Sequence, residues 1–232
     1  MTLVINYMSE NFSLIASDTK VTFKDNIIEP YFESKIISLD NIFGWTSGMG
    51  LGNFLEIFKE KLSKANISNI KEDIEKIFFD SKSKMIEWEM SEKEIDDSAV
   101  SLAMILKNDS ILDIFSCYIS NTYTDGKLKL FNGFLIFYPS NYTQIDVDEF
   151  QNRYDMLNQE CNLNKVINQT LEMFNEISTN SPSNVGRDCE IGLLYFDDNK
   201  VCKKLIRINM DDYELDKDNY NIEVNDYGSI TF

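Results

Sequence analysis

The sequence predicts one α+β domain, a four-layer αββα sandwich over residues 1–210, followed by an acidic C-terminal extension at 211–232. Of its 232 residues, 43% are hydrophobic and 26% are charged, which is enough apolar material for a packed core. Only 3 Pro and 9 Gly are present, so little of the chain suits a flexible linker between domains. Strand-like and helix-like segments follow one another in blocks, which favours stacked antiparallel sheets with helices outside.

The first fifty residues have the pattern of strands joined by short turns. β-prone runs occupy residues 3–7, 12–17, 21–23, 27–28, 35–39 and 42–46. Between Phe54 and Trp88 the period changes, because apolar residues recur three or four positions apart with lysines and glutamates between them. This stretch predicts two consecutive amphipathic helices.

The second half repeats this order of elements. Strands are expected at residues 100–106, 111–120, 128–131 and 134–138, then a helical block at 149–177 broken near 161–162, a loop at 178–186, and strands at 190–196 and 201–208. From Asp211 to Asp226 the chain carries seven acidic residues against Lys217 alone, so we expect a solvated extension there.

The composition excludes several kinds of site. The chain contains no histidine, which excludes a Ser-His-Asp triad, a Cys-His dyad and a His-ligated zinc. Its formal net charge is −17, so its field repels polyphosphate and anionic lipid, and we expect neither nucleic acid nor membrane as a partner. The turn carboxylates are expected to be solvated, and no metal or cofactor is predicted.

The cysteines indicate a reducing compartment. Cys117, Cys161, Cys189 and Cys202 show no C-x-x-C spacing and lie in or beside apolar stretches. The apolar run at the start is too short for a secretory leader, and no stretch has the roughly 18 apolar residues that a membrane helix needs. We therefore expect reduced thiols and a cytoplasmic protein.

Thr2 is the first candidate for chemistry. It follows the initiator methionine and is small enough for that methionine to be removed, which would leave Thr2 with a free α-amine. Such an amine has a reference pKa of about 7.7 to 8.0, so near neutral pH part of it is unprotonated and can accept the proton of the adjacent hydroxyl. One residue then supplies nucleophile and base, without histidine.

Three further segments accompany Thr2. Residues 14–20 read Leu-Ile-Ala-Ser-Asp-Thr-Lys and place Asp18 at the end of a strand. Lys35 opens the run Ile-Ile-Ser-Leu, and residues 46–50 read Thr-Ser-Gly-Met-Gly before a helix, with Gly48 in the middle. This pattern resembles the N-terminal-nucleophile hydrolases of proteasome type, meaning proteasome β-subunits and the related bacterial peptidase subunit. The resemblance is specific over residues 2–66 and extends in element order to residue 208.

The resemblance implies a threonine hydrolase that cleaves peptide or other amide bonds. Thr2 would be the nucleophile, Lys35 held by Asp18 would lower the pKa of its amine and hydroxyl, and the Gly48 N–H would face the oxyanion. It also implies a homo-oligomer, such as a ring, and an ATP-dependent unfoldase as partner.

The second half departs from the family pattern. Where the family has a Ser-Gly pair after the middle strands, the chain has Ser140 followed by asparagine. In the loop at 180–188, Ser183 is the candidate for supporting the Thr2 amine, although Arg187 follows the glycine there. Two alternatives therefore stay open: a catalytically silent domain of this type that serves in binding or assembly, and an acidic interaction module of unrelated fold.

Overall fold

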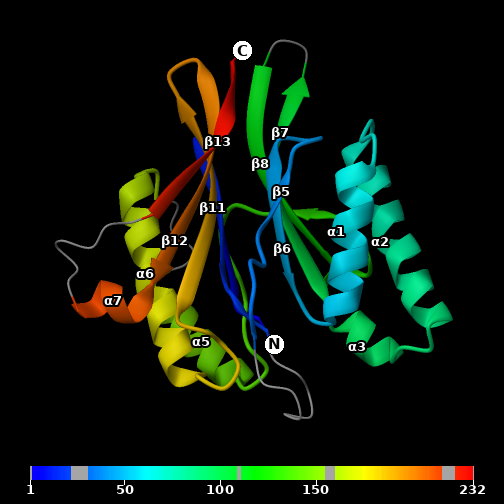
Figure 1. Cartoon of the computed structure of the whole chain (residues 1–232), viewed down its shortest axis with the longest axis horizontal. Coiled ribbons are helices and arrows are strands. Elements are labelled where there is room, and N and C mark those ends of the chain that lie inside the picture. The colour runs from blue at the N-terminus through cyan, green and yellow to red at the C-terminus, as the bar shows by residue number, and fades with distance from the viewer. Residues whose placement is uncertain (1, 22–30, 109–110, 155–159, 216–222, 232) are drawn as a thin grey trace.

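The computed structural model describes residues 2–21, 31–108, 111–154, 160–215 and 223–231. Two antiparallel sheets face each other in it (Figure 1). In spatial order, the six-stranded sheet consists of β10 (Gly133–Phe137), β1 (Val4–Met8), β2 (Phe12–Asp18), β11 (Asp188–Asp197), β12 (Lys200–Asn209) and β13 (Glu223–Thr231). The five-stranded sheet consists of β5 (Ile37–Leu39), β6 (Gly44–Met49), β7 (Ala99–Asn108), β8 (Ile111–Ser120) and β9 (Lys129–Leu130). The short strands β3 (Lys20–Val21) and β4 (Tyr31–Phe32) pair with each other.

Helices lie on the outer side of each sheet (Figure 1). Beside the five-stranded sheet are α1 (Gly52–Lys64), α2 (Ile70–Glu87) and α3 (Glu92–Asp96). Beside the six-stranded sheet are α5 (Gln144–Arg153) and α6 (Leu163–Asn180). Two short helices complete the described elements, α4 (Asn121–Thr124) and α7 (Met210–Leu215). The predicted α+β class is confirmed, because long helices and antiparallel sheets both contribute to one body.

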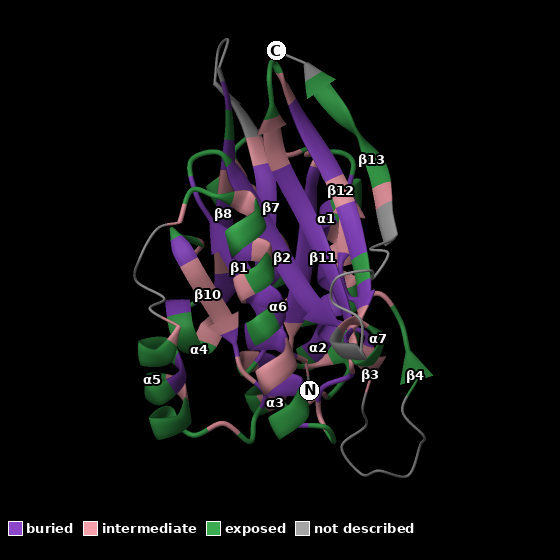
Figure 2. Ribbon diagram, turned by 90° about the vertical axis from the view of Figure 1, so that its left-hand side faces the viewer, coloured by how far each residue is buried: buried purple, intermediate pink, exposed green. Residues whose placement is uncertain are grey.

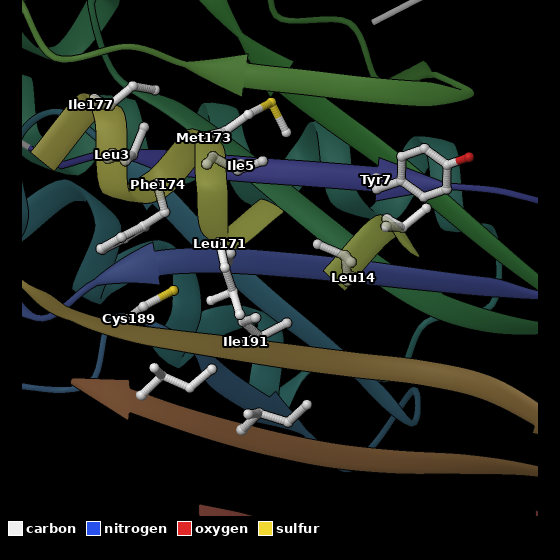
Figure 3. Packing of buried hydrophobic residues seen from close by; sticks show 14 of the residues in the cluster. Leu3, Ile5, Tyr7, Leu14, Leu171, Met173, Phe174, Ile177, Cys189 and Ile191 are labelled. Atoms are coloured by element: carbon white, nitrogen blue, oxygen red, sulfur yellow. The ribbon is translucent and has the colours of Figure 1, made fainter. Parts of the chain in front are cut away.

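Apolar side chains form three clusters that match these layers. One lies between α6 and the six-stranded sheet, where Leu3, Phe174 and Ile191 pack together (Figure 3). A second joins α1 and α2 to the five-stranded sheet, and the third fills the space between the sheets. The strands are therefore buried on both faces along most of their length, as Figure 2 shows for β1, β2 and β11. This explains why their sequences read as continuous apolar runs.

The predicted helical block at 149–177 is two helices with different beginnings. Thr143 caps α5 with a reciprocal capping box to Asp146, so this helix begins at residue 144, earlier than the apolar pattern indicates. The side chain of Asn162 accepts a hydrogen bond from the N–H of Lys165 and caps α6. The predicted interruption near residues 161–162 is thus a helix start.

Part of the segment for which the sequence predicts an acidic extension is a strand. β13 pairs with β12 at the edge of the six-stranded sheet, with an irregularity in register between Cys202 and Lys204. An edge strand keeps its carboxylates in water, which is why its sequence resembles a solvated tail. The division at residue 210 remains a prediction. The strand expected at 27–28 lies outside the described residues.

No helix in the described ranges combines the length and apolar character that crossing a membrane requires.

The two sheets are joined through Trp45. Its indole Nε1 donates a hydrogen bond to the Leu193 carbonyl at 3.1 Å, and the side chain is buried. Gly192 on β11 lies against the ring, because a Cβ at this position would be 2.8 Å from Trp45 Cγ and 3.0 Å from Ile36 Cγ2. The absence of a side chain at Gly192 therefore lets the sheets approach closely.

We predict that Gly192→Ala lowers the free energy of unfolding by about 1 to 3 kcal/mol, because the added methyl group overpacks the space between the sheets. Gly52→Ala is the matched control: an added Cβ there meets nothing within 4 Å, and alanine in the first turn of α1 changes stability by at most about 1 kcal/mol, in the favourable direction. Urea denaturation measures the free energy of unfolding of both variants. An equal decrease in the two variants would contradict the packing argument.

Candidate functional site

The carboxylate of Asp18 is the centre of the candidate site. β2 ends at this residue, its side chain is fully buried, and four donors surround it. Oδ1 accepts the Leu3 N–H at 3.0 Å, while Oδ2 accepts the Lys20 N–H at 3.1 Å and the Gly186 N–H at 3.3 Å. The Lys35 Nζ donates to Oδ2 at 2.9 Å. One carboxylate therefore joins the start of the chain, the end of β2, the loop before β11 and a lysine.

Lys35 is a buried ammonium with a buried partner. Its side chain is 10% exposed, and besides Asp18 it donates a hydrogen bond to the Lys20 carbonyl. Burial lowers the pKa of Lys35 from its usual range, and the charges of Asp18, Glu33 and Glu190 oppose that decrease. The structure thus brings Asp18 and Lys35 into direct contact, which is incompatible with the alternative of an unrelated module in which the first strands do not converge on Lys35.

Thr2 lies one peptide unit from this ion pair. It is partly buried, and the N–H of Leu3, the next residue, bonds Asp18 Oδ1. The Leu3 carbonyl also accepts a hydrogen bond from Ser17 Oγ at 3.0 Å, so both polar main-chain groups of Leu3 are held by β2. These bonds, together with the β1–β2 pairing in which Val4 lies opposite Ser17, hold the peptide group between Thr2 and Leu3 against Asp18.

Gly48 is near the end of β6, where the chain turns into α1. A Cβ there would lie 2.6 Å from the Ala99 carbonyl oxygen and 2.8 Å from Leu55 Cδ2. The glycine therefore permits close packing against β7 and α1. Two residues later, Gly50 has a φ of +112°, and a Cβ would lie 2.3 Å from Ser98 Oγ. That hydroxyl accepts the Leu51 N–H, which fixes the turn into the helix.

The loop from 181 to 187 lies beside β3. Lys20 Nζ donates to the Pro182 carbonyl at 2.7 Å, and a Cβ on Gly186 would be 2.9 Å from Lys20 Cβ. Ser183 is exposed in this loop. Arg187 points toward α6 and α7, where it bonds Ser178 Oγ and pairs with the carboxylate of Asp211. The described contacts of this loop reach the site through Gly186.

Ser140 and Ser181 occupy the second region that the sequence singles out near the site. Ser140 is exposed. Ser181 is buried, and its Oγ accepts a hydrogen bond from Asn141 Nδ2 at 2.8 Å. The buried serine of this region is therefore Ser181, whereas the sequence pattern pointed to Ser140 and Ser183.

Two charged residues near Lys35 escape the sequence analysis. Glu190 on β11 is buried and accepts hydrogen bonds from Ser34 Oγ at 2.6 Å and from Arg207 Nε at 2.9 Å. Lys59 on α1 donates from Nζ to the Lys35 carbonyl at 2.9 Å. The sequence does show that Glu190 interrupts an apolar strand and that Lys59 lies in an amphipathic helix. Neither pattern reveals which residue the side chain contacts.

No group of three or more His, Cys, Asp or Glu side chains that could hold a metal ion occurs in the part of the chain that the structure describes. The charged groups at the site include the buried carboxylates of Asp18 and Glu190 and the ammonium groups of Lys35, Lys20 and Lys59. They can polarise and orient a nucleophile, and they can hold charge next to it.

Comparison with known proteins identifies the fold. No protein-family model matches the chain, and no curated protein matches it. Among solved structures it is similar to Anbu (ancestral beta-subunit) from Yersinia bercovieri, with a TM-score of 0.61 and 11% identity over 83% of this chain and 81% of that one. It is also similar to a Gly-1 mutant of Anbu from Hyphomicrobium sp. strain MC1, with a TM-score of 0.58 and 12% identity over 98% of this chain and 89% of that one.

These comparisons correct the family assignment. The sequence pattern indicated a proteasome-type N-terminal-nucleophile hydrolase resembling proteasome β-subunits and the bacterial peptidase subunit, but the neighbours are Anbu proteins at 11% and 12% identity, and no family model matches. The physical reason is that four positions within residues 2–66 reflect a shared turn and strand geometry, which several families on one scaffold can have in common. The chain thus has a proteasome-like fold similar to that of Anbu.

Proposed function

We propose that the chain is an amide hydrolase in which Thr2, after removal of Met1, is the nucleophile. The observation that supports it most is the shared carboxylate of Asp18, which holds the Leu3 N–H through one oxygen and the Lys35 ammonium through the other. This arrangement supports a position for the first residue of the processed chain near a buried positive charge. A positive charge there stabilises a neutral amine and an alkoxide relative to their protonated forms.

The proposed reaction has two stages. The Thr2 Oγ attacks the amide carbon while the hydroxyl proton moves to the Thr2 amine, and the carbonyl oxygen becomes an oxyanion. The C–N bond then breaks, the proton passes to the leaving amine, and an ester to Thr2 remains. Water hydrolyses this ester by the same route and restores Thr2. Lys35 acts by its charge, and the Gly48 N–H is the proposed donor to the oxyanion.

Ser183 is the least supported member of the proposed site. Its loop is held to Asp18 through the Gly186 N–H, which supports a role for the loop. Its side chain is exposed, so an effect on the Thr2 amine would need a water molecule or a substrate between them. We retain it as a residue of secondary importance.

The proposal also includes the layer architecture, the oligomeric state, the substrate, the partner and the compartment. The helix and sheet layers of Figure 1 support the four-layer αββα sandwich that the sequence predicts. Similarity to proteins described as an ancestral beta-subunit supports a homo-oligomer as the working form. A peptide or other amide as substrate, an unfoldase partner and a cytoplasmic setting are part of the hypothesis that began with the sequence.

A second candidate function is a silent domain of this fold that serves in binding or assembly. The exposed Ser183 and the turning of Arg187 toward Asp211 favour it, because both leave the loop with few polar groups near Thr2. The two functions differ in one early step, since only the hydrolase requires removal of Met1.

We predict that the purified protein lacks Met1 and that Thr2→Ala abolishes its activity. Removal of Met1 shows in the intact mass, and covalent labelling by a threonine-directed electrophile such as a β-lactone should fall at least about a hundredfold in the variant, because the nucleophile is missing. Thr2→Ser should retain measurable labelling. Thr122→Ala, an exposed threonine far along the chain, is the matched control and should label like the wild type. Retention of Met1 by the whole population would support the silent domain.

We predict that Asp18→Asn destabilises the fold by about 3 to 5 kcal/mol, because it leaves Lys35 buried without its anion. Loss of the carboxylate lowers the pKa of Lys35 further, so at rising pH the native state binds fewer protons than the unfolded chain. The deficit should therefore shrink as the pH rises from 7 toward the ordinary lysine pKa of about 10.4. Urea unfolding at several pH values tests this. Asp80→Asn, at an exposed position on α2, should stay within about 0.5 kcal/mol.

A further inference from the structure

Lys59 lies behind Lys35 on the side of helix α1. Its Nζ donates to the Lys35 carbonyl at 2.9 Å, and the Nζ of Lys35 donates to Asp18 Oδ2. α1 itself is fixed by the turn at Gly48 to Gly50, so Lys59 connects the helix after the proposed oxyanion donor to the segment that carries the proposed charge. The two lysines thus join three parts of the site.

The placement of Lys59 is costly for the fold. Burial lowers its pKa to about 8, and the neighbouring positive charge of Lys35 lowers it as well. Glu33 and Glu56 counteract this only through their more distant charges. No carboxylate in the described part of the chain lies within ion-pair distance of Lys59. A buried ammonium group without an ion-pair partner destabilises a fold, and groups with perturbed pKa values are concentrated at functional sites.

We propose that Lys59 is a positioning residue of the Thr2 site, which holds the main chain of Lys35 from the helix side and supplies a second positive charge behind it. This inference rests on the proposed function. The groups that face Lys35 are Asp18 from β2, Glu190 from β11 and Glu33 from its own segment, and Lys59 is the cation among these groups.

The positive charge of Lys59 should change the pKa of neighbouring groups in a definite direction. The positive charge of Lys35 lowers the pKa of Lys59. While Lys59 is charged, its field favours the neutral form of the Thr2 amine, so removing the Lys59 charge should raise the pKa of that amine. As the pH rises through about 8, Lys59 loses its proton and this effect fades in the wild type.

The first experiment is independent of activity. Competitive labelling of amines with trace acetic anhydride, read by peptide mass spectrometry, gives a titration midpoint for each lysine. We expect Lys59 to have a midpoint near pH 8. In Lys35→Met the Lys59 midpoint should rise by about half a pH unit or more, because the neighbouring positive charge is gone, and in the control Lys64→Met, at an exposed lysine of the same helix, it should not move. An unchanged Lys59 midpoint in Lys35→Met would overturn the proposal.

The second experiment measures labelling of Thr2 by the β-lactone across pH 5 to 10. We expect Lys59→Met to label about tenfold more slowly at pH 7.5, with its acid limb moved to higher pH. Lys59→Arg keeps the charge and should stay within about threefold of the wild type, with an unmoved acid limb. A purely structural role would lower the labelling rate without moving the acid limb, and this result would also overturn the proposal.

The two experiments separate this inference from the proposed function. If Thr2 is never labelled but the Lys59 midpoint rises in Lys35→Met, the hydrolase is wrong and the coupling of the two lysines stands. If Thr2 is labelled and the midpoint and acid limb stay unchanged, Lys59 has no part in a working site.

Discussion

The structure around the start of the chain depends on one buried carboxylate. Asp18 accepts hydrogen bonds from Leu3, Lys20, Gly186 and Lys35, so β1, β2, the loop before β11 and the segment before β5 all meet at its two oxygens. A buried carboxylate is tolerable only with such partners, because water no longer solvates it. The same carboxylate holds the Leu3 N–H and the Lys35 ammonium, so the requirements of folding and of the proposed chemistry meet at one residue.

Close approach of the two sheets is the second constraint. Gly192 allows β11 to pack against the ring of Trp45, and Gly48 allows β6 to pack against β7 and α1. Between the sheets, Ser13 bonds Ser116 through their hydroxyls, so the layer also contains polar groups that satisfy one another. These contacts align the ends of β2 and β6, which come from different sheets.

Family membership was harder to infer than fold. The spacing of Thr2, Asp18, Lys35 and Gly48 follows from a hairpin, a turn and a strand-to-helix connection, and any family built on this scaffold needs similar turns. Similarity to Anbu at 11% identity therefore reports the shared scaffold.

The sequence by itself determined the order of strands and helices, because local periodicity and capping residues such as Asn162 act over a few neighbours. It also pointed to Asp18 and Lys35, through the resemblance of their segments to a family pattern. Only the tertiary structure decided that Lys59 and Glu190 lie next to Lys35, and that the acidic end contributes the edge strand β13. Those contacts join residues many positions apart in the sequence. Their energies depend on burial and on electrostatic fields, which a local sequence pattern does not specify.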